Sequence, residues 1–134
     1  MFKDIKPQMK NHEVQEILAA CVFDNSPEGM KTLANDYNRH SSWQLFGWFE
    51  NENLVGVCGY EVHLDWVEIL HIATHENARG RGIARNIVNK LQKLYNMPIE
   101  AETDNDAVEF YQKCGFKVTA ICKYNVQRFA CVLS

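Results

Sequence analysis

The sequence predicts a mixed α+β domain, with a central, mostly antiparallel sheet of six to seven strands, one parallel pair, and about four flanking helices. Two observations favour this class. From Trp43 onward, short runs of aromatic and β-branched residues alternate with turn residues, which is typical of antiparallel strands. A strand, a glycine-rich loop, a helix and another strand then follow in order, and that succession makes two neighbouring strands parallel.

The first third of the chain predicts one short strand and two helices. The strand covers residues 1–5 and ends before Pro7. The first helix has Asn11 as its expected N-cap and an apolar face of Val14, Ile17, Leu18, Cys21 and Val22. The second helix starts at Ser26-Pro27-Glu28, where a hydroxyl cap precedes proline and an acidic residue. Its apolar stripe consists of Met30, Leu33, Ala34 and Tyr37.

The rest of the chain supplies most of the sheet. Strands are expected at residues 43–50, 54–61, 66–74, 99–103, 116–123 and 126–133. A hairpin turn at residues 51–53 joins the first two of these strands. The helix after Gly82 has a predicted apolar face of Ile83, Ile87, Val88, Leu91 and Leu94, and Pro98 marks its end. A shorter helix begins at about Asp106 and is closed by Gly115.

The composition is that of a folded protein, since 46% of the 134 residues are hydrophobic and 23% are charged. We therefore expect residues 1–134 to form one domain. The net charge of −3 disfavours binding to nucleic acid through bulk electrostatics. The longest apolar run, residues 17–23, is too short to span a bilayer, and no signal peptide is visible at the N-terminus. The five cysteines are odd in number and form no C-x-x-C pair, which predicts a reducing, cytoplasmic setting.

The glycine-rich loop at residues 79–84 is the clearest candidate for a binding site. Glycines let the backbone approach a ligand, and the free N–H groups at a helix start favour an anion. Arg79, Arg81 and Arg85 add charge that suits phosphate. The Gly-Lys-Ser/Thr of a P-loop is absent, and a dinucleotide fingerprint would need a glycine where Arg85 stands. The alternative interpretation is a solvated basic turn.

Two motifs in this order resemble those of the GNAT superfamily of acetyl-CoA-dependent N-acetyltransferases. Residues 79–84 fit the family signature Arg/Gln-x-x-Gly-x-Gly/Ala, and residues 69–74 look like its central strand. The second motif is Ala107-x-x-Phe110-Tyr111-x-x-x-Gly115-Phe116. The family often has a proline after the central strand, where this chain has Glu76. The resemblance implies an enzyme that transfers an acetyl group directly from acetyl-CoA to an amine.

The resemblance also implies how acetyl-CoA is held. The pantetheine arm would pair with backbone groups of Ile72, Ala73 and Thr74, and a bulge would aim an N–H at the thioester oxygen. The residues expected to bind pyrophosphate through N–H groups are Arg79, Gly80, Arg81, Gly82, Ile83 and Ala84. Asn105 would contact the cofactor arm, or act as an N-cap. Tyr111 would be the general acid that protonates the leaving thiolate, and also a cofactor contact; its alternative role is core packing.

Several carboxylates are candidates for the base that deprotonates the amine. Glu100 matches some family members best, and Glu68 is its competitor. Glu102 and Asp104 lie near them, so the group should at least attract a cationic amine. His71 and His75 lie four residues apart, but no third ligand accompanies them, so no metal is expected.

The acceptor is left open as a small-molecule or peptide amine. A non-catalytic acyl-CoA-binding module and an unrelated nucleotide-binding domain are the competing functions. A homodimer through the last strands or through the aromatic strand at residues 43–50 is possible by analogy with the family.

Overall fold

One sheet of seven strands runs through residues 2–134, which the computed structural model describes. The strands are β1 (Phe2–Asp4), β2 (Trp43–Glu50), β3 (Asn53–Val62), β4 (Val67–Thr74), β5 (Ile99–Thr103), β6 (Lys117–Lys123) and β7 (Val126–Leu133). Their order is β1-β2-β3-β4-β5-β7-β6, and only β4 and β5 are parallel neighbours. This confirms the predicted mixed sheet. Met1, which begins the predicted first strand, lies outside the described residues.

The described residues also contain four α-helices and three 3-10 turns. They are α1 (His12–Leu18), α2 (Pro27–Arg39), α3 (Ile83–Tyr95), α4 (Val108–Lys113), η1 (Lys6–Gln8), η2 (Ala19–Cys21) and η3 (Glu76–Ala78). Ser26 caps α2 as predicted, because its hydroxyl oxygen accepts a hydrogen bond from the N–H of Gly29 at 3.1 Å. Asn11 is at the N-cap of α1, but its side chain makes no capping bond to a described residue.

Some helical predictions are wrong in detail. The first helix ends at Leu18, and η2 then leaves Cys21 exposed instead of on a continuous apolar face. Leu94 lies in the last turn of α3 and is 49% exposed. The fourth helix starts at Val108, because a carboxylate oxygen of Asp104 accepts from the N–H of Asp106 at 3.0 Å and holds the preceding residues in a turn.

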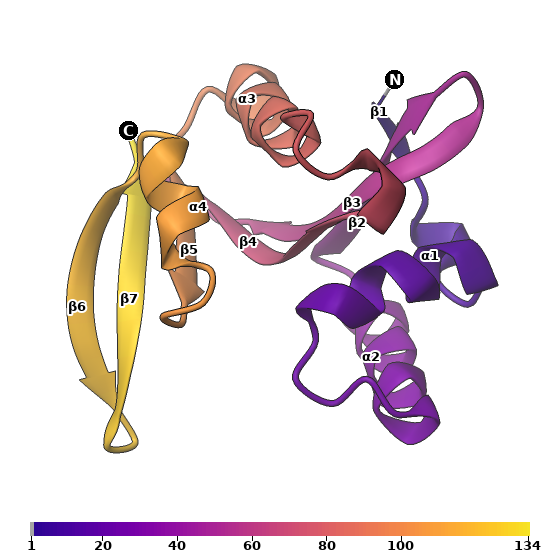
Figure 1. Cartoon of the computed structure of the whole chain (residues 1–134), viewed down its shortest axis with the longest axis horizontal. Helices are drawn as coiled ribbons and strands as arrows, with labels where there is room; N and C mark the ends of the chain where they lie inside the picture. The colour runs from indigo at the N-terminus through magenta and orange to yellow at the C-terminus, as the bar shows by residue number, and fades with distance from the viewer. Residues whose placement is uncertain (1) are drawn as a thin grey trace.

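The two faces of the sheet carry separate apolar cores (Figure 1). On one face α3 and α4 cover the strands, and Ile87, Val88 and Leu91 are fully buried there. On the other face α1 and α2 pack against the strands with Leu18 and Tyr37. Helices therefore cover both sides of the sheet at β3 and β4.

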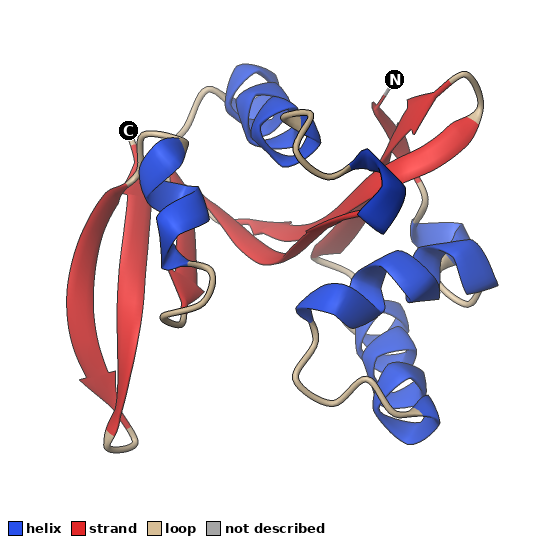
Figure 2. Ribbon diagram, in the orientation of Figure 1, coloured by secondary structure: helices blue, strands red, loops and turns tan. Residues whose placement is uncertain are grey.

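The sheet separates between β4 and β5 (Figure 2). These strands pair only at Val67 with Ile99 and at Glu68 with Glu100. Beyond Glu68, β4 continues to Thr74 beside β3 alone, and β5 follows β7 instead. The edge of β4 that faces β5 is therefore left without a strand partner over most of its length.

A bulge in β4 decides which backbone groups face this open edge. Tyr60 pairs with Ile69 and Gly59 with His71, so Leu70 is an extra residue. Before the bulge, the N–H of Val67 donates toward β5, to the carbonyl of Pro98 at 2.9 Å. After it, the N–H of His75 donates the opposite way, to Val55 at 2.7 Å. By alternation from His75, the backbone groups of Ile72 and Thr74 point to the open edge, and those of Ala73 point to β3.

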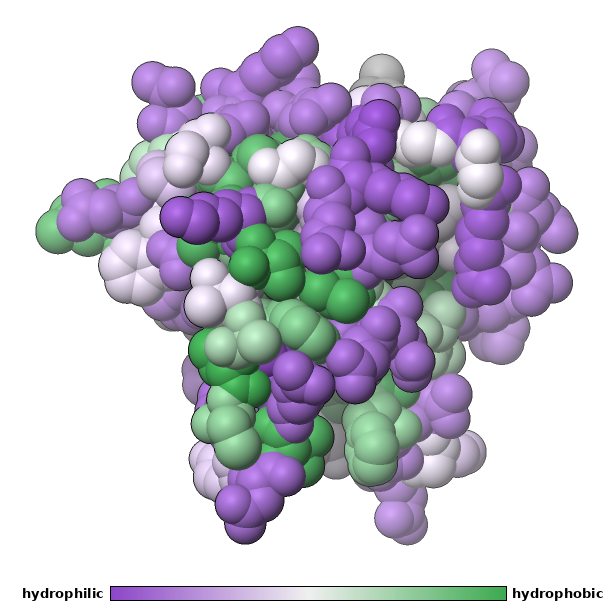
Figure 3. All heavy atoms as spheres, turned by 60° about the vertical axis from the view of Figure 1, so that its left-hand side comes forward, coloured by the Kyte–Doolittle hydropathy of each residue, from purple (hydrophilic) through white to green (hydrophobic). Residues whose placement is uncertain are grey.

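The β6–β7 side of the molecule presents apolar residues gathered between hydrophilic ones (Figure 3). Tyr124 and Val126, at the tip of this hairpin, are 89% and 58% exposed.

All five cysteines are free thiols. None of the helices within residues 2–134 has the length and apolarity needed to cross a membrane.

Candidate active site

The glycine-rich loop between η3 and α3 is open to solvent. Gly80 and Gly82 have φ values of +81° and +76°, which glycine adopts without strain. A Cβ added at either position would meet no atom within 4 Å. Among residues 2–134, the backbone N–H groups of Gly80, Arg81 and Gly82 have no acceptor, and the first turn of α3 adds further free donors. The loop can therefore accept an anion.

The three arginines of this region are held by the protein itself. Arg81 pairs with Glu50 at the end of β2, and Arg85 donates to the carbonyl of Lys113 at 2.6 Å. Arg79 donates to the carbonyl of Thr74 at 3.4 Å. The donors that remain free to bind a phosphate are thus mainly backbone N–H groups.

A surface hollow of about 450 Å³ lies beside this loop and includes Arg81 and His75. Glu13, Glu16 and Glu52 also line it, so its walls are acidic. This charge does not suit a pyrophosphate, and the anion site is better placed at the loop and the start of α3.

Residues of η2 pack against β4 near its open edge. The Cys21 thiol, from η2, donates to the carbonyl of Leu18 at 3.3 Å and lies beside the backbone of Ile72, the residue whose N–H points away from β3. Cys21 is exposed as a residue, yet burial around its sulfur raises the pKa of the thiol to about 11.

Tyr111 has a buried ring and a hydroxyl that makes no hydrogen bond within residues 2–134. The ring packs edge-on against Phe116, with centroids 5.1 Å apart, and the residue is 6% exposed. No buried side-chain oxygen or nitrogen in the described chain lacks a hydrogen bond, so the unbonded hydroxyl oxygen must reach solvent. Burial raises the pKa of Tyr111 above its usual range, and the phenol holds its proton at neutral pH. Both predicted roles, packing and proton donation, are compatible with this geometry.

Asn105 lies exposed in the turn before α4 and does not cap that helix. Asp104 makes the bonds instead, since its carboxylate accepts from the N–H groups of Asp106 and Ala107 at 3.0 and 3.1 Å. The N-cap role considered for Asn105 is therefore wrong, and its side chain is left facing solvent.

The predicted carboxylates differ in their partners. Glu68 and Glu100 are paired residues at the point where β4 and β5 separate. Glu102 is bound by Lys123 at 3.3 Å and by Arg128 at 3.5 Å. Glu100 has no ion pair within residues 2–134, whereas Glu68 Oε1 lies 2.9 Å from Nε2 of His63.

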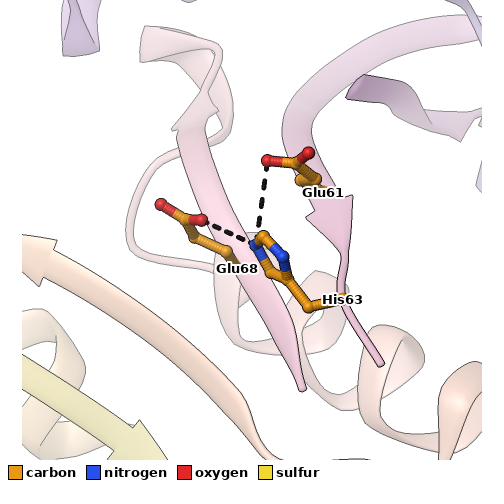
Figure 4. A group of neighbouring side chains, drawn as sticks. All are labelled: Glu61, His63 and Glu68. Carbon is orange, nitrogen blue, oxygen red and sulfur yellow. Dashed lines mark hydrogen bonds and ion pairs between the residues drawn. The ribbon is translucent and has the colours of Figure 1, made fainter. Parts of the chain in front are cut away.

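His63 lies between two carboxylates at the β3–β4 connection (Figure 4). Its Nε2 is 2.9 Å from Glu68 Oε1 and 3.7 Å from Glu61 Oε1. All three side chains are partly buried. This cluster was not predicted, because the predicted strand ends at residues 61 and 66 would not place Glu61 opposite Glu68, which is the observed register.

His71 and His75 do not form a pair. Nδ1 of His71 is 2.7 Å from the hydroxyl of Tyr37, and Nδ1 of His75 accepts from the N–H of Asn77 at 3.1 Å. Gly59 makes room for the first contact, since a Cβ there would lie 1.5 Å from the Tyr37 oxygen. Burial raises the pKa of Tyr37, so its hydroxyl keeps its proton beside the imidazole of His71.

Comparison with known proteins agrees with this architecture. Residues 11–116 match the model of the Acetyltransferase (GNAT) family, and the chain belongs to that family. An uncharacterized N-acetyltransferase of Bacillus methanolicus is 33% identical over 86 residues, which cover 63% of this chain and 71% of that protein.

Solved structures share the fold at low sequence identity. An acetyltransferase of the GNAT family from Desulfovibrio desulfuricans has a TM-score of 0.79 at 17% identity, covering 100% of this chain and 98% of its own. An acetyltransferase of Bacillus subtilis in complex with CoA has a TM-score of 0.67 at 21% identity, with 92% of each chain covered. These similarities confirm the predicted fold class.

The His71 contact predicts a pH dependence of stability. Burial lowers the pKa of His71 to about 4, below the ordinary value of 6.5, so the unfolded chain binds more protons between these values. The free energy of unfolding should fall as pH decreases from 6.5 to 4, by up to roughly 3 kcal/mol from this group. Urea unfolding of wild type and His71→Gln at several pH values measures it. His12→Gln, at a highly exposed histidine, is the control and should keep the wild-type slope. An equal slope in His71→Gln would contradict the assignment.

Proposed function

We propose that the protein transfers the acetyl group of acetyl-CoA to a primary amine by direct attack within a ternary complex. The observation that carries this proposal is the unpaired edge of β4, which leads from the β4–β5 separation to the open glycine loop. Family membership supports it, because several solved relatives hold CoA, and one from Elizabethkingia anophelis holds acetyl-CoA.

The chain's own backbone would bind acetyl-CoA. The pyrophosphate is held by N–H groups of the loop and of the first turn of α3, formed by Arg79, Gly80, Arg81, Gly82, Ile83 and Ala84. The pantetheine arm runs along β4 and pairs with Ile72 and Thr74 like an added strand. Ala73, the third residue expected in this role, faces β3 through its backbone and supports the strand. Asn105 has an unbonded side chain with which to contact the cofactor arm.

Acetyl-CoA supplies a thioester whose carbonyl carbon is attacked by the neutral amine. A C–N bond forms and the C–S bond breaks. The N–H of Ile72, directed to the open edge by the bulge, would donate to the carbonyl oxygen as negative charge develops there. The Cys21 thiol lies beside Ile72 in the free protein and would give way to the thioester.

Two further groups would move protons. Tyr111 donates its phenolic proton to the departing thiolate. Its raised pKa and its solvent-accessible hydroxyl permit this role. Glu100 receives the amine proton through water, because it lies at the strand separation without an ion pair to any described residue. Glu68 is the second candidate, although His63 already engages its carboxylate.

The acceptor would be a small-molecule or peptide amine that arrives as a cation. Glu100 and Glu68 are neighbours across β4 and β5, and their charge favours approach of an ammonium group. We place the reaction in the cytoplasm, where free thiols such as the exposed Cys122 stay reduced. The edge strand β6, with its exposed hairpin tip, is the surface through which we would expect a homodimer.

Replacing Gly82 by alanine should weaken cofactor binding. The added methyl group projects into the open space where the pyrophosphate is expected, so we predict that the Kd for acetyl-CoA rises by about tenfold or more. Isothermal titration measures this Kd. The left-handed φ also strains alanine, by about 1 kcal/mol of stability.

Gly115→Ala separates strain from binding, because Gly115 has a φ of +93° and an added Cβ would meet only Leu133 at 3.8 Å. This control should lose similar stability and keep its affinity for acetyl-CoA. Unchanged binding by Gly82→Ala would remove the loop from the cofactor site.

The change Tyr111→Phe should lower turnover by at least about tenfold, since it removes a proton donor and keeps the packed ring. CoA release with a panel of amines measures turnover, and titration should show that acetyl-CoA still binds.

Tyr124→Phe, at a tyrosine that is 89% exposed, is the matched control and should turn over like wild type. Wild-type turnover by Tyr111→Phe would exclude Tyr111 as the acid. Tight acetyl-CoA binding by the wild type without CoA release from any amine would favour the non-catalytic module instead.

A further inference from the structure

Glu61, His63 and Glu68 converge on one point outside the cofactor path. Glu61 comes from β3 and Glu68 from β4, where they are paired residues, and His63 follows β3 in the connection (Figure 4). One ligand atom from each lies within 4.8 Å of the others. From this arrangement we propose that the three side chains form a binding site for a divalent transition metal ion, with zinc as the best fit.

The spacing of the donor atoms suits zinc. A tetrahedral zinc ion with bonds of about 2.0 to 2.1 Å needs ligand atoms about 3.3 Å apart. His63 Nε2 lies 2.9 Å from Glu68 Oε1 and 3.7 Å from Glu61 Oε1, so the two separations bracket that value. Small rotations of the side chains would admit the ion between them.

Neighbouring groups already hold the ligands in place. The hydroxyl of Ser42 donates a hydrogen bond to the second oxygen of Glu61 at 2.7 Å. The imidazole of His63 stacks on Trp66, with ring centroids 4.3 Å apart and planes at 19°. The backbone N–H of His63 donates to the backbone carbonyl of Trp66 at 2.8 Å, which fixes the backbone of the connection. Contacts of this kind orient metal ligands and sharpen affinity.

The chemistry of the ligands indicates which ion would bind. Two carboxylates balance the charge of a divalent cation, and an imidazole nitrogen favours zinc over magnesium or calcium. The side chains remain 24% to 44% exposed, which leaves room for water as a fourth ligand. With Glu68 bound to the metal, Glu100 would be the carboxylate left for the amine.

Titration of the whole chain with zinc chloride in a calorimeter tests the site without using activity. Exposed thiols also bind zinc, so the background carries Cys21→Ser and Cys122→Ser. We expect one zinc per chain, a rise in Tm with zinc, and at least about tenfold weaker binding in His63→Asn and in Glu61→Gln. Magnesium chloride should bind much more weakly than zinc.

His12→Asn is the matched control, because His12 also faces a glutamate, Glu16 at 3.6 Å, but on the exposed surface of α1. It should bind zinc like the parent. Circular dichroism checks that each variant is folded, and Glu61→Gln keeps the shape of its side chain if His63→Asn does not fold. Absence of stoichiometric binding, equal loss in His12→Asn, or full binding by both His63→Asn and Glu61→Gln would overturn the proposal. These outcomes leave acetyl transfer untouched, since acetyl-CoA binding is measured separately.

Discussion

The short pairing between β4 and β5 is the constraint on which the rest of the site depends. Two residue pairs hold these parallel strands together at Val67 and Glu68, and beyond them the sheet opens. The core under α3 and α4 joins the two halves, because it contains Val67 of β4 and Ile99 of β5, whereas α1 and α2 pack against β2, β3 and β4 (Figure 1). The separation exposes a strand edge in the middle of a sheet, which is a place where an extended ligand can pair.

The groups that face this opening belong mostly to the backbone. The bulge at Leu70 turns the N–H of Ile72 toward the open edge, and the left-handed glycines at 80 and 82 expose N–H groups at the start of α3. The arginines beside the loop are instead engaged with Glu50, Thr74 and Lys113.

Much of the fold could be predicted because local patterns decided it. The bounds of β2, β5 and β7 coincide with the prediction, and Ser26 caps α2 through a local hydrogen bond. Features that arise between distant segments were missed. The contact of Cys21 with Ile72 joins η2 to β4, and Tyr37 reaches His71 only because Gly59 leaves space. The Glu61–His63–Glu68 cluster depends on which residues of β3 and β4 pair with each other. That register changes with each residue added to or removed from the connection, and the hydrophobic periodicity of the strands does not fix the length of the connection.

Hydrogen–deuterium exchange of the protein with and without CoA tests the central claim most directly, because the claim concerns particular backbone N–H groups. Slower exchange at Ile72 and Thr74 and across residues 80–84, with little change at the β6–β7 hairpin, is the predicted result. Protection confined to other segments, or none at saturating CoA, would contradict binding of acetyl-CoA along the open edge of β4.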